Sequence, residues 1–146
     1  MRKYFLLSAV ALLATSTANA ATRYAEVTAK AELVTANTFE KYSDLDFGVI
    51  AIKSNNKDST VTISKNSVVS HTGDVLSVDN ATLATFDDLN SMHFPETVTI
   101  KNGENTLSIS LSDESTGGFA IGGTLNIPAN VPVGVYTGSF TVIELD

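Results

Sequence analysis

Residues 119–146, FAIGGTLNIPANVPVGVYTGSFTVIELD, decide the fold class of this chain. Residues 119–127 are rich in apolar and β-branched side chains, which predicts a strand. Pro128 and Pro132 predict a turn after it, because proline fixes φ and has no amide proton for a ladder. Residues 135–145 carry apolar side chains at a spacing of two, which predicts a returning strand. The apolar face of that strand consists of Tyr136, Phe140 and Val142. A chain that ends in such a hairpin is expected to be all-β.

Upstream, short alternating segments are separated by turn residues. Asn102-Gly103 is a strong hairpin signal between two of these segments. Residues 80–86 fit either a short helix or an irregular crossing loop. The segments predicted as strands are residues 45–52, 60–64, 67–70, 74–78, 96–101 and 106–111. About seven to nine short strands with frequent turns predict one antiparallel β-sandwich or barrel.

The first 20 residues have the pattern of a secretory signal peptide. Arg2-Lys3 forms a charged start, residues 5–13 form an apolar stretch, and Ala18-Asn19-Ala20 fits a cleavage site. An uncleaved membrane anchor is the alternative reading, but the apolar stretch is too short to span a bilayer. We expect an exported protein of the periplasm, cell surface or extracellular space, with residues 21–146 as a single domain and no integral membrane span after cleavage.

Residues 21–34 open that domain with unbroken alternation. Four polar residues, Glu26, Thr28, Lys30 and Glu32, separate the apolar ones. A helix would scatter the apolar side chains around its circumference, whereas a strand collects them on one face. The segment is therefore predicted to be an N-terminal strand. Its apolar face consists of Ala25, Val27, Ala29, Ala31 and Leu33.

Composition limits the function classes. The chain has 16 acidic and nine basic residues, and two of the basic ones lie in the signal peptide. An acidic surface without a basic patch argues against nucleic acid as a partner. The absence of cysteine excludes a disulfide framework. The absence of tryptophan weakens a sugar-binding reading based on aromatic platforms.

Catalytic and metal-binding patterns are weak. His71 and His93 fit no metal-ligand spacing. Two groups could suggest a calcium site: Asp87-Asp88 with Asn90, and Asp44 with Asp46. Neither group matches the EF-hand spacing. Aspartate and asparagine are also common in turns. There is no G-x-S-x-G elbow and no S-x-x-K motif. We expect no catalytic residues, no metal and no cofactor, and therefore a protein that is not an enzyme.

Two segments together resemble the bacterial secreted family called domain of unknown function 4402. The first is LDFG at residues 45–48, and the second is IGGTLNIPANVPVGVYTGSFTV at residues 121–142. The matching motif residues are Leu45, Asp46, Phe47, Gly48, Gly122, Gly123, Pro128, Gly134, Tyr136 and Gly138. The layout is also similar to that of chaperone–usher pilins and spore-coat-U-type subunits. This resemblance implies an immunoglobulin-like sandwich that is completed by another subunit's N-terminal strand.

On that resemblance, residues 21–34 would be the donor strand, and the donor side chains would be Ala25, Val27, Ala29, Ala31 and Leu33. The partners would be other subunits or a periplasmic chaperone, reached by strand addition. The chain departs from those pilins because it lacks their frequent cysteine pair and because its donor face is rich in alanine. The same strand could instead pair within its own chain.

Two functional hypotheses follow. The first is an exported, non-catalytic structural or surface protein, a fimbrial or pilin-like subunit. The alternative is a self-contained β-sandwich binding module, such as an adhesin or a periplasmic ligand binder. For that alternative, the site is expected in a loop-lined hollow near Asp87-Asp88 or residues 112–118.

Overall fold

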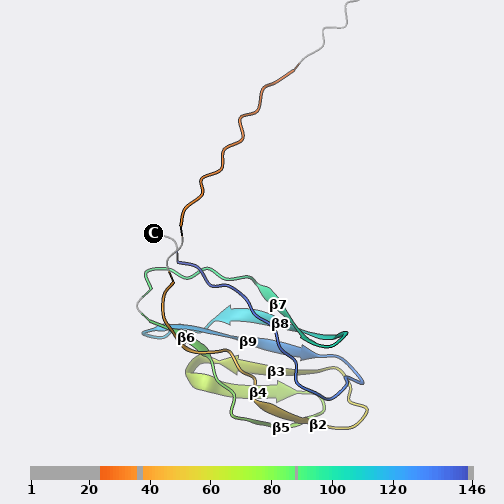
Figure 1. Cartoon of the computed structure of the whole chain (residues 1–146). Coiled ribbons are helices and arrows are strands. Elements are labelled where there is room, and N and C mark those ends of the chain that lie inside the picture. The colour runs from red at the N-terminus through yellow and green to blue at the C-terminus, as the bar shows by residue number, and fades with distance from the viewer. Residues whose placement is uncertain (1–23, 36–37, 88, 145–146) are drawn as a thin grey trace, which may run out of the picture. The chain divides into compact units, whose positions relative to one another are not determined.

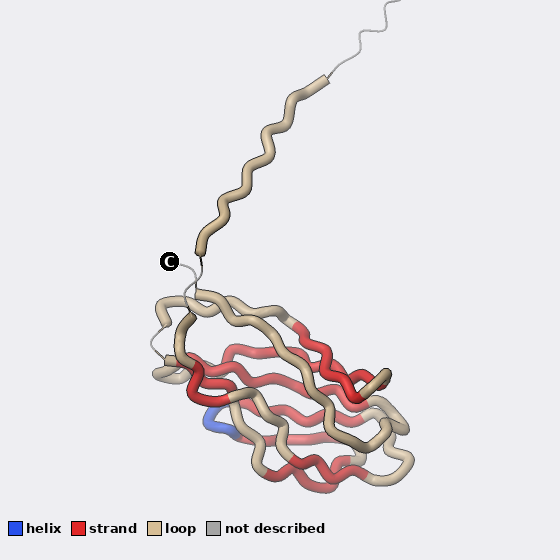
Figure 2. The backbone as a smooth tube through the Cα atoms, viewed as in Figure 1, coloured by secondary structure: helices blue, strands red, loops and turns tan. Residues whose placement is uncertain are grey.

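The computed structural model describes residues 24–35, 38–87 and 89–144. The chain divides into two units, residues 1–35 and residues 36–146, and each is described by itself. Among its described residues, the second unit contains nine strands, one short 3-10 turn at Lys65–Ser67 and no α-helix (Figures 1 and 2). The strands are β1 (Lys41–Ser43), β2 (Val49–Ile52), β3 (Ser59–Ser64), β4 (Val68–Thr72), β5 (Val75–Asp79), β6 (Ala84–Phe86), β7 (Thr97–Asn102), β8 (Asn105–Asp113) and β9 (Phe119–Ile127). The all-β prediction is confirmed.

The larger sheet is built around β9, and all of its pairings are antiparallel. One edge of β9 pairs with β8, which in turn pairs with β7. The other edge of β9 is shared: residues 123–127 pair with β3, and residues 119–121 pair with β6. Strand β4 extends the sheet beyond β3, and β1 pairs with β6. Seven strands therefore belong to this sheet.

The smaller sheet consists of β2 and β5 alone, again antiparallel. Apolar side chains at alternate positions of β3, β8 and β9 form the main core with residues of the smaller sheet. Val61, Ile63 and Ile121 are the most deeply buried side chains. This alternation follows from the pleat of a strand, which sends successive side chains to opposite faces. The predicted antiparallel sandwich of about seven to nine strands is confirmed.

The predicted C-terminal hairpin is wrong in its second half. Residues 135–144 form no continuous strand, and they do not pair with β9. They meet the segment around β7 at two isolated bridges, Lys101 with Thr137 and His93 with Ile143. The physical reason is that both edges of β9 are already occupied, by β8 on one side and by β3 and β6 on the other. The proline loop therefore carries the chain to the outer side of β7.

The predictions for one turn and two further segments had different outcomes. The Asn102-Gly103 hairpin is confirmed between β7 and β8, and Gly103 has the positive φ that the turn needs. Residues 80–86 are not helical, and their last part forms β6. The first half of the predicted strand 45–52 stays outside a ladder and makes one isolated bridge, from Asp46 to Thr82.

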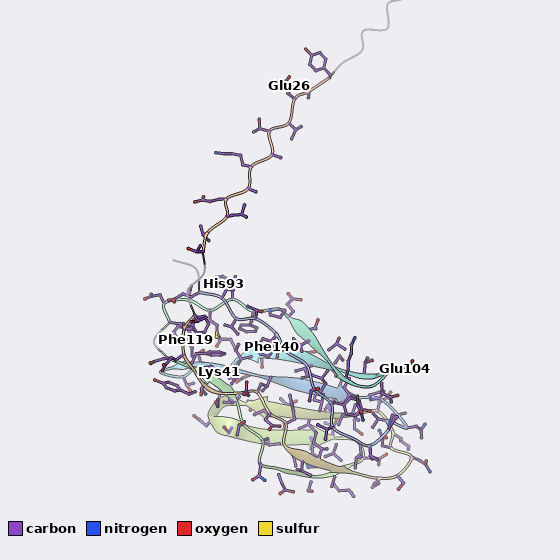
Figure 3. All side chains as sticks on the ribbon, viewed as in Figure 1. Glu26, Lys41, His93, Glu104, Phe119 and Phe140 are labelled. Carbon is purple, nitrogen blue, oxygen red and sulfur yellow. The ribbon has the colours of Figure 1, made fainter. Side chains whose placement is uncertain are left out.

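The described residues of the first unit, 24–35, run as an extended segment outside any β-ladder. Every described side chain in it is exposed, with Leu33 at 92% and Val27 at 89%. Figure 3 shows side chains leaving this segment alternately to its two sides, with Glu26 among them. The strand predicted for residues 21–34 is thus not paired into a sheet over its described part. Residues 21–23 and the predicted signal peptide, residues 1–20, lie outside the described residues.

Candidate functional site: an apolar groove

A groove of about 550 Å³ crosses the inner face of the larger sheet. One wall is formed by residues 44–50 with Ile52, and the other by residues 131–138. The floor consists of side chains from β7, β8 and β9, namely Ile100, Leu107, Ile109, Leu125 and Ile127. Only Asp44, Asp46 and Tyr136 carry titratable side chains among the lining residues. The groove is therefore suited to an apolar occupant.

The first wall is held by the LDFG residues. Asp46 exchanges two backbone hydrogen bonds with Thr82, at 3.0 and 2.7 Å. The Asp46 carboxylate also accepts the Gly48 N–H at 2.7 Å. Gly48 has φ +68°, and a Cβ there would overlap the carbonyl oxygen of Asp79. Leu45 and Phe47 turn into the core, so the motif is a corner that starts β2.

The second wall begins in a loop fixed by the buried Asn56. The Asn56 side-chain amide donates to the Pro128 carbonyl at 2.8 Å, and its oxygen accepts the Val131 N–H at 3.1 Å. The Asn56 backbone carbonyl accepts the Asn130 N–H at 2.9 Å. Asp58 adds a fourth bond, because its carboxylate accepts the backbone N–H of residue 129 at 2.8 Å. The chain after β9 is therefore anchored to the turn between β2 and β3.

The second wall continues along β7. The Tyr136 hydroxyl donates to the Pro132 carbonyl at 2.7 Å and fixes the bend between these two residues. Thr137 exchanges backbone hydrogen bonds of 2.8 and 2.9 Å with Lys101. At Gly138 the chain passes so close to β7 that a Cβ would lie 2.6 Å from the Thr99 oxygen. Gly134 packs against the Asn102 side chain in the same way.

The fold brings together most of the motif residues that the sequence singled out. Gly122 and Gly123 lie elsewhere, in β9, where a Cβ would overlap the backbone of β3 or β8. Pro128 starts the anchored loop and is not part of the groove lining. The motif residues that line the groove are Leu45, Asp46, Phe47, Gly48, Gly134, Tyr136 and Gly138. The two ends of the motif thus form opposite walls of one site.

Large apolar side chains remain exposed at the rims of the groove. Val133 and Val135 are 87% and 80% exposed on one rim, and Val49 is 68% exposed on the other. These valines are not among the site residues predicted from the sequence. Their signal was the run Val131-Pro-Val-Gly-Val135, in which every second residue is valine inside an otherwise turn-forming stretch.

The candidate metal residues lie on separate elements. His71 is in β4, and His93 bridges to Ile143. Within residues 24–35, 38–87 and 89–144, no group of three or more His, Asp or Glu could hold a metal ion. Asp87 donates its backbone N–H to the Glu40 carbonyl at 3.3 Å, and Asp88 lies outside the described residues.

The two carboxylates with a lowered pKa, those of Asp74 and Asp113, also lie away from the groove. The Lys57 backbone N–H donates to Asp74 at 2.9 Å, and the Lys53 ammonium lies 3.0 Å from the same carboxylate, so the pKa of Asp74 is lowered. Hydrogen bonds from Ser115 lower the pKa of Asp113. Both groups hold turns by hydrogen bonds, and neither lines the groove.

A second, shallower hollow of about 450 Å³ lies at one end of β3, β8 and β9. Polar side chains of Asp58, Thr60, Ser108 and Asn126 contribute to its lining. The loop at residues 112–118 does not line either hollow.

The fold and the groove define a class: an antiparallel β-sandwich domain with an apolar groove between two wall segments that are not joined in one sheet. The model of the family described as domain of unknown function (DUF4402) matches residues 33–143, and the chain belongs to this family. The family resemblance carried by LDFG and the C-terminal segment is therefore confirmed. The match includes Leu33 and leaves the preceding apolar positions of the N-terminal segment outside it. No curated protein and no solved structure matches the chain. Among the described residues, no helix is long and apolar enough to cross a membrane.

Proposed function

We propose that this protein is an exported structural subunit of fimbrial type that extends a filament by donating its N-terminal segment to another copy. The observation that carries the proposal is the state of residues 24–35. They keep an alternating apolar face, yet every described side chain is exposed and no ladder includes them. A strand of this kind presents unpaired backbone groups and an apolar face together, which is the arrangement that strand addition uses.

Burial of the apolar face of residues 24–35 against a partner would be favourable. Burial of apolar surface stabilises by about 25 cal/mol per Å², and a new ladder satisfies the backbone groups at the same time. Of the five apolar positions, Val27 and Leu33 carry the largest side chains and contribute most. Each alanine adds little, so the backbone ladder would supply a large share of the association.

Other features agree with a structural role outside the cytoplasm. The signal-peptide pattern of residues 1–20 supports export. The groove lining offers an apolar surface in place of a paired nucleophile and base, which supports a non-catalytic function. The layout that resembles pilins supports other subunits, or a periplasmic chaperone that adds a strand, as the partners.

The proposal is tested by the solution size of the chain from Ala21 to Asp146. Light scattering over a range of concentrations should show assemblies larger than a monomer. Ala29→Asp places a charge on the apolar face and should reduce assembly at least tenfold. Thr28→Asp adds the same charge to the opposite face of the same segment and should assemble like the unmodified chain. A chain that stays monomeric at all concentrations, or equal behaviour of the two variants, would overturn the proposal.

A self-contained binding module is the second candidate function. The hollow near Asp58, Thr60, Ser108 and Asn126 favours it, because hydroxyl, amide and carboxylate groups there could bind a small polar ligand. An NMR titration with neutral disaccharides would test it. Saturable shifts confined to these residues in a monomeric chain would support a binding module over a subunit.

A further inference from the structure

We propose that the outer face of the larger sheet binds a neutral, hydroxyl-rich polysaccharide. The proposal goes beyond the filament role and does not depend on it, because it uses the sheet and not the N-terminal segment. Two rows of hydroxyl side chains carry it, together with the hollow that members of one row line.

The rows follow from the strand registers. Five strands lie side by side in the order β7, β8, β9, β3 and β4 (Figure 1). Their outward side chains alternate with core residues such as Val61, Leu107 and Leu125, which are buried. The registers align the outward positions in two rows across the sheet. The first row is Thr99, Ser108, Asn126, Thr60 and Thr72, and the second is Thr97, Ser110, Thr124, Thr62 and Ser70. All except Asn126 carry a hydroxyl group, and we call this surface the hydroxyl face.

The two rows of the hydroxyl face carry no charged side chain. The chain has 16 acidic residues, yet neither row contains one. Lys101 continues the outward pattern of β7 beyond Thr99 and supplies a single cation next to the rows. Exposed surfaces usually carry interspersed charges for solubility. Rows without charge create no strong field to attract an ionic partner, so a neutral partner fits them better.

Hydroxyl groups match the chemistry of a polysaccharide. Each has one donor and two acceptor lone pairs, so it can bond to a sugar hydroxyl in either direction. Two pairs bond within the face, Thr60 with Thr72 at 2.8 Å and Thr62 with Thr124 at 2.9 Å. These bonds orient the side chains and leave lone pairs for a ligand. None of the side chains in the two rows is buried, so a polymer could reach them.

The hollow of about 450 Å³ gives the face a place to hold one sugar unit. Its lining includes Ser108, Asn126 and Thr60, which are consecutive members of the first row on β8, β9 and β3. Thr106 adds a further hydroxyl group and Asp58 adds a carboxylate. A concave site with a few convergent polar groups is the usual form of a ligand site. We therefore place one sugar unit in the hollow and its neighbours along the first row.

The twist of the sheet favours a flexible polymer over a flat crystalline surface. Adjacent strands rotate by about 20–25°, so the direction changes by about 80–100° from β7 to β4. A rigid plane, such as crystalline cellulose, would touch only part of the face. A dissolved polysaccharide chain can follow the twist.

Affinity electrophoresis of the chain from Ala21 to Asp146 tests the proposal. The chain is run in native gels with and without a dissolved neutral polymer, namely mixed-linkage β-glucan, galactomannan or dextran. At least one of the three should retard the chain, and the anionic polymer alginate should not. The retardation should persist in about 0.5 M sodium chloride, because salt screens charges and leaves neutral hydrogen bonds in place.

A double variant tests the face itself. Ser108→Ala with Ser110→Ala removes two exposed hydroxyl groups of β8. Losing one hydrogen bond should weaken binding about fivefold, so this variant should need at least about ten times as much polymer for half-maximal retardation. Ser77→Ala with Ser139→Ala is the matched control, because both serines are exposed and lie outside the face. Both double variants should melt like the unmodified chain, and the control should be retarded equally.

The proposal is overturned if none of the three neutral polymers retards the chain, if salt abolishes the retardation, or if the two double variants behave alike. A chain that assembles but is not retarded overturns this proposal alone. A chain that is retarded but never assembles overturns the filament proposal alone.

Discussion

Gly48 controls how the chain enters β2. Its N–H is held by the Asp46 carboxylate, its φ is +68°, and the backbone of residues 79–81 packs directly against its Cα. A side chain at this position would meet two separate penalties, the left-handed backbone conformation and an overlap with a carbonyl oxygen. The glycine of the LDFG motif is therefore required for the backbone conformation of one wall of the groove.

Gly48→Ala should lower the free energy of unfolding by about 2–3 kcal/mol or more, as measured by urea denaturation. Gly103→Ala is the control, because Gly103 also has positive φ, at 60°, and has open space around it. That variant should lose only about 1 kcal/mol. Equal losses of unfolding free energy at the two glycines would show that the close approach of the Asp79 carbonyl oxygen to Gly48 does not affect stability.

At the scale of elements, the segment after β9 is held by side chains from the turn between β2 and β3. Asn56 is 3% exposed and contacts residues on both sides of the Pro128–Pro132 loop. This anchor aligns the second wall with the first, because Asn56 lies in the turn between β2 and β3. The position of the second wall of the groove therefore depends on the side-chain hydrogen bonds of Asn56 as well as on sheet pairing.

Asn56→Ala removes two side-chain hydrogen bonds to that loop and leaves the Val131 N–H without its acceptor. We expect a loss of about 2–3 kcal/mol in unfolding free energy, since each such bond contributes about 1 kcal/mol and an unpaired buried group costs more. Hydrogen exchange should accelerate at residues 130–131. Asn105→Ala is the control and should change little, because Asn105 lies at the exposed start of β8 and its side chain donates one hydrogen bond of 3.4 Å to the Asn102 carbonyl. Unchanged exchange at residues 130–131 would contradict the anchoring role.

At the scale of the whole molecule, both core clusters lie within the second unit. Residues 24–35 contribute no buried side chain. The stability of the sandwich in dilute solution should therefore be independent of the N-terminal segment, whereas assembly should require it.

A chain of residues 34–146 should melt within about 1 °C of the chain of residues 21–146 when both are dilute and monomeric, because none of the described residues removed, 24–33, has a buried side chain. Adding a peptide of residues 21–33 should then raise the melting temperature. At a hundred times its Kd the peptide would stabilise by about 2.7 kcal/mol. The same peptide with Ala29→Asp is the control. If the shorter chain melts much lower at every concentration, the segment is part of its own sandwich.

The sequence by itself determined the all-β class, the Asn102-Gly103 hairpin, the strand at residues 119–127 and the two motif ends that identify the family. These features are local, because side chains alternate along a strand and turns require particular residues. It also indicated the alternating N-terminal segment. Sequence alone gave the wrong partner for residues 135–145, because their apolar spacing fits a strand beside β9 as well as a segment beside β7.

Only the tertiary structure decided which strand edges were free to pair with the C-terminal segment. The occupied edges of β9 place the C-terminal segment beside β7, where residues 131–138 form one wall of the groove. It also places Phe47 and Tyr136, far apart in sequence, on opposite walls of one site. The physical reason is that alternation fixes which face of a strand is buried, whereas the choice of neighbour depends on competition among all strands for a limited number of edges.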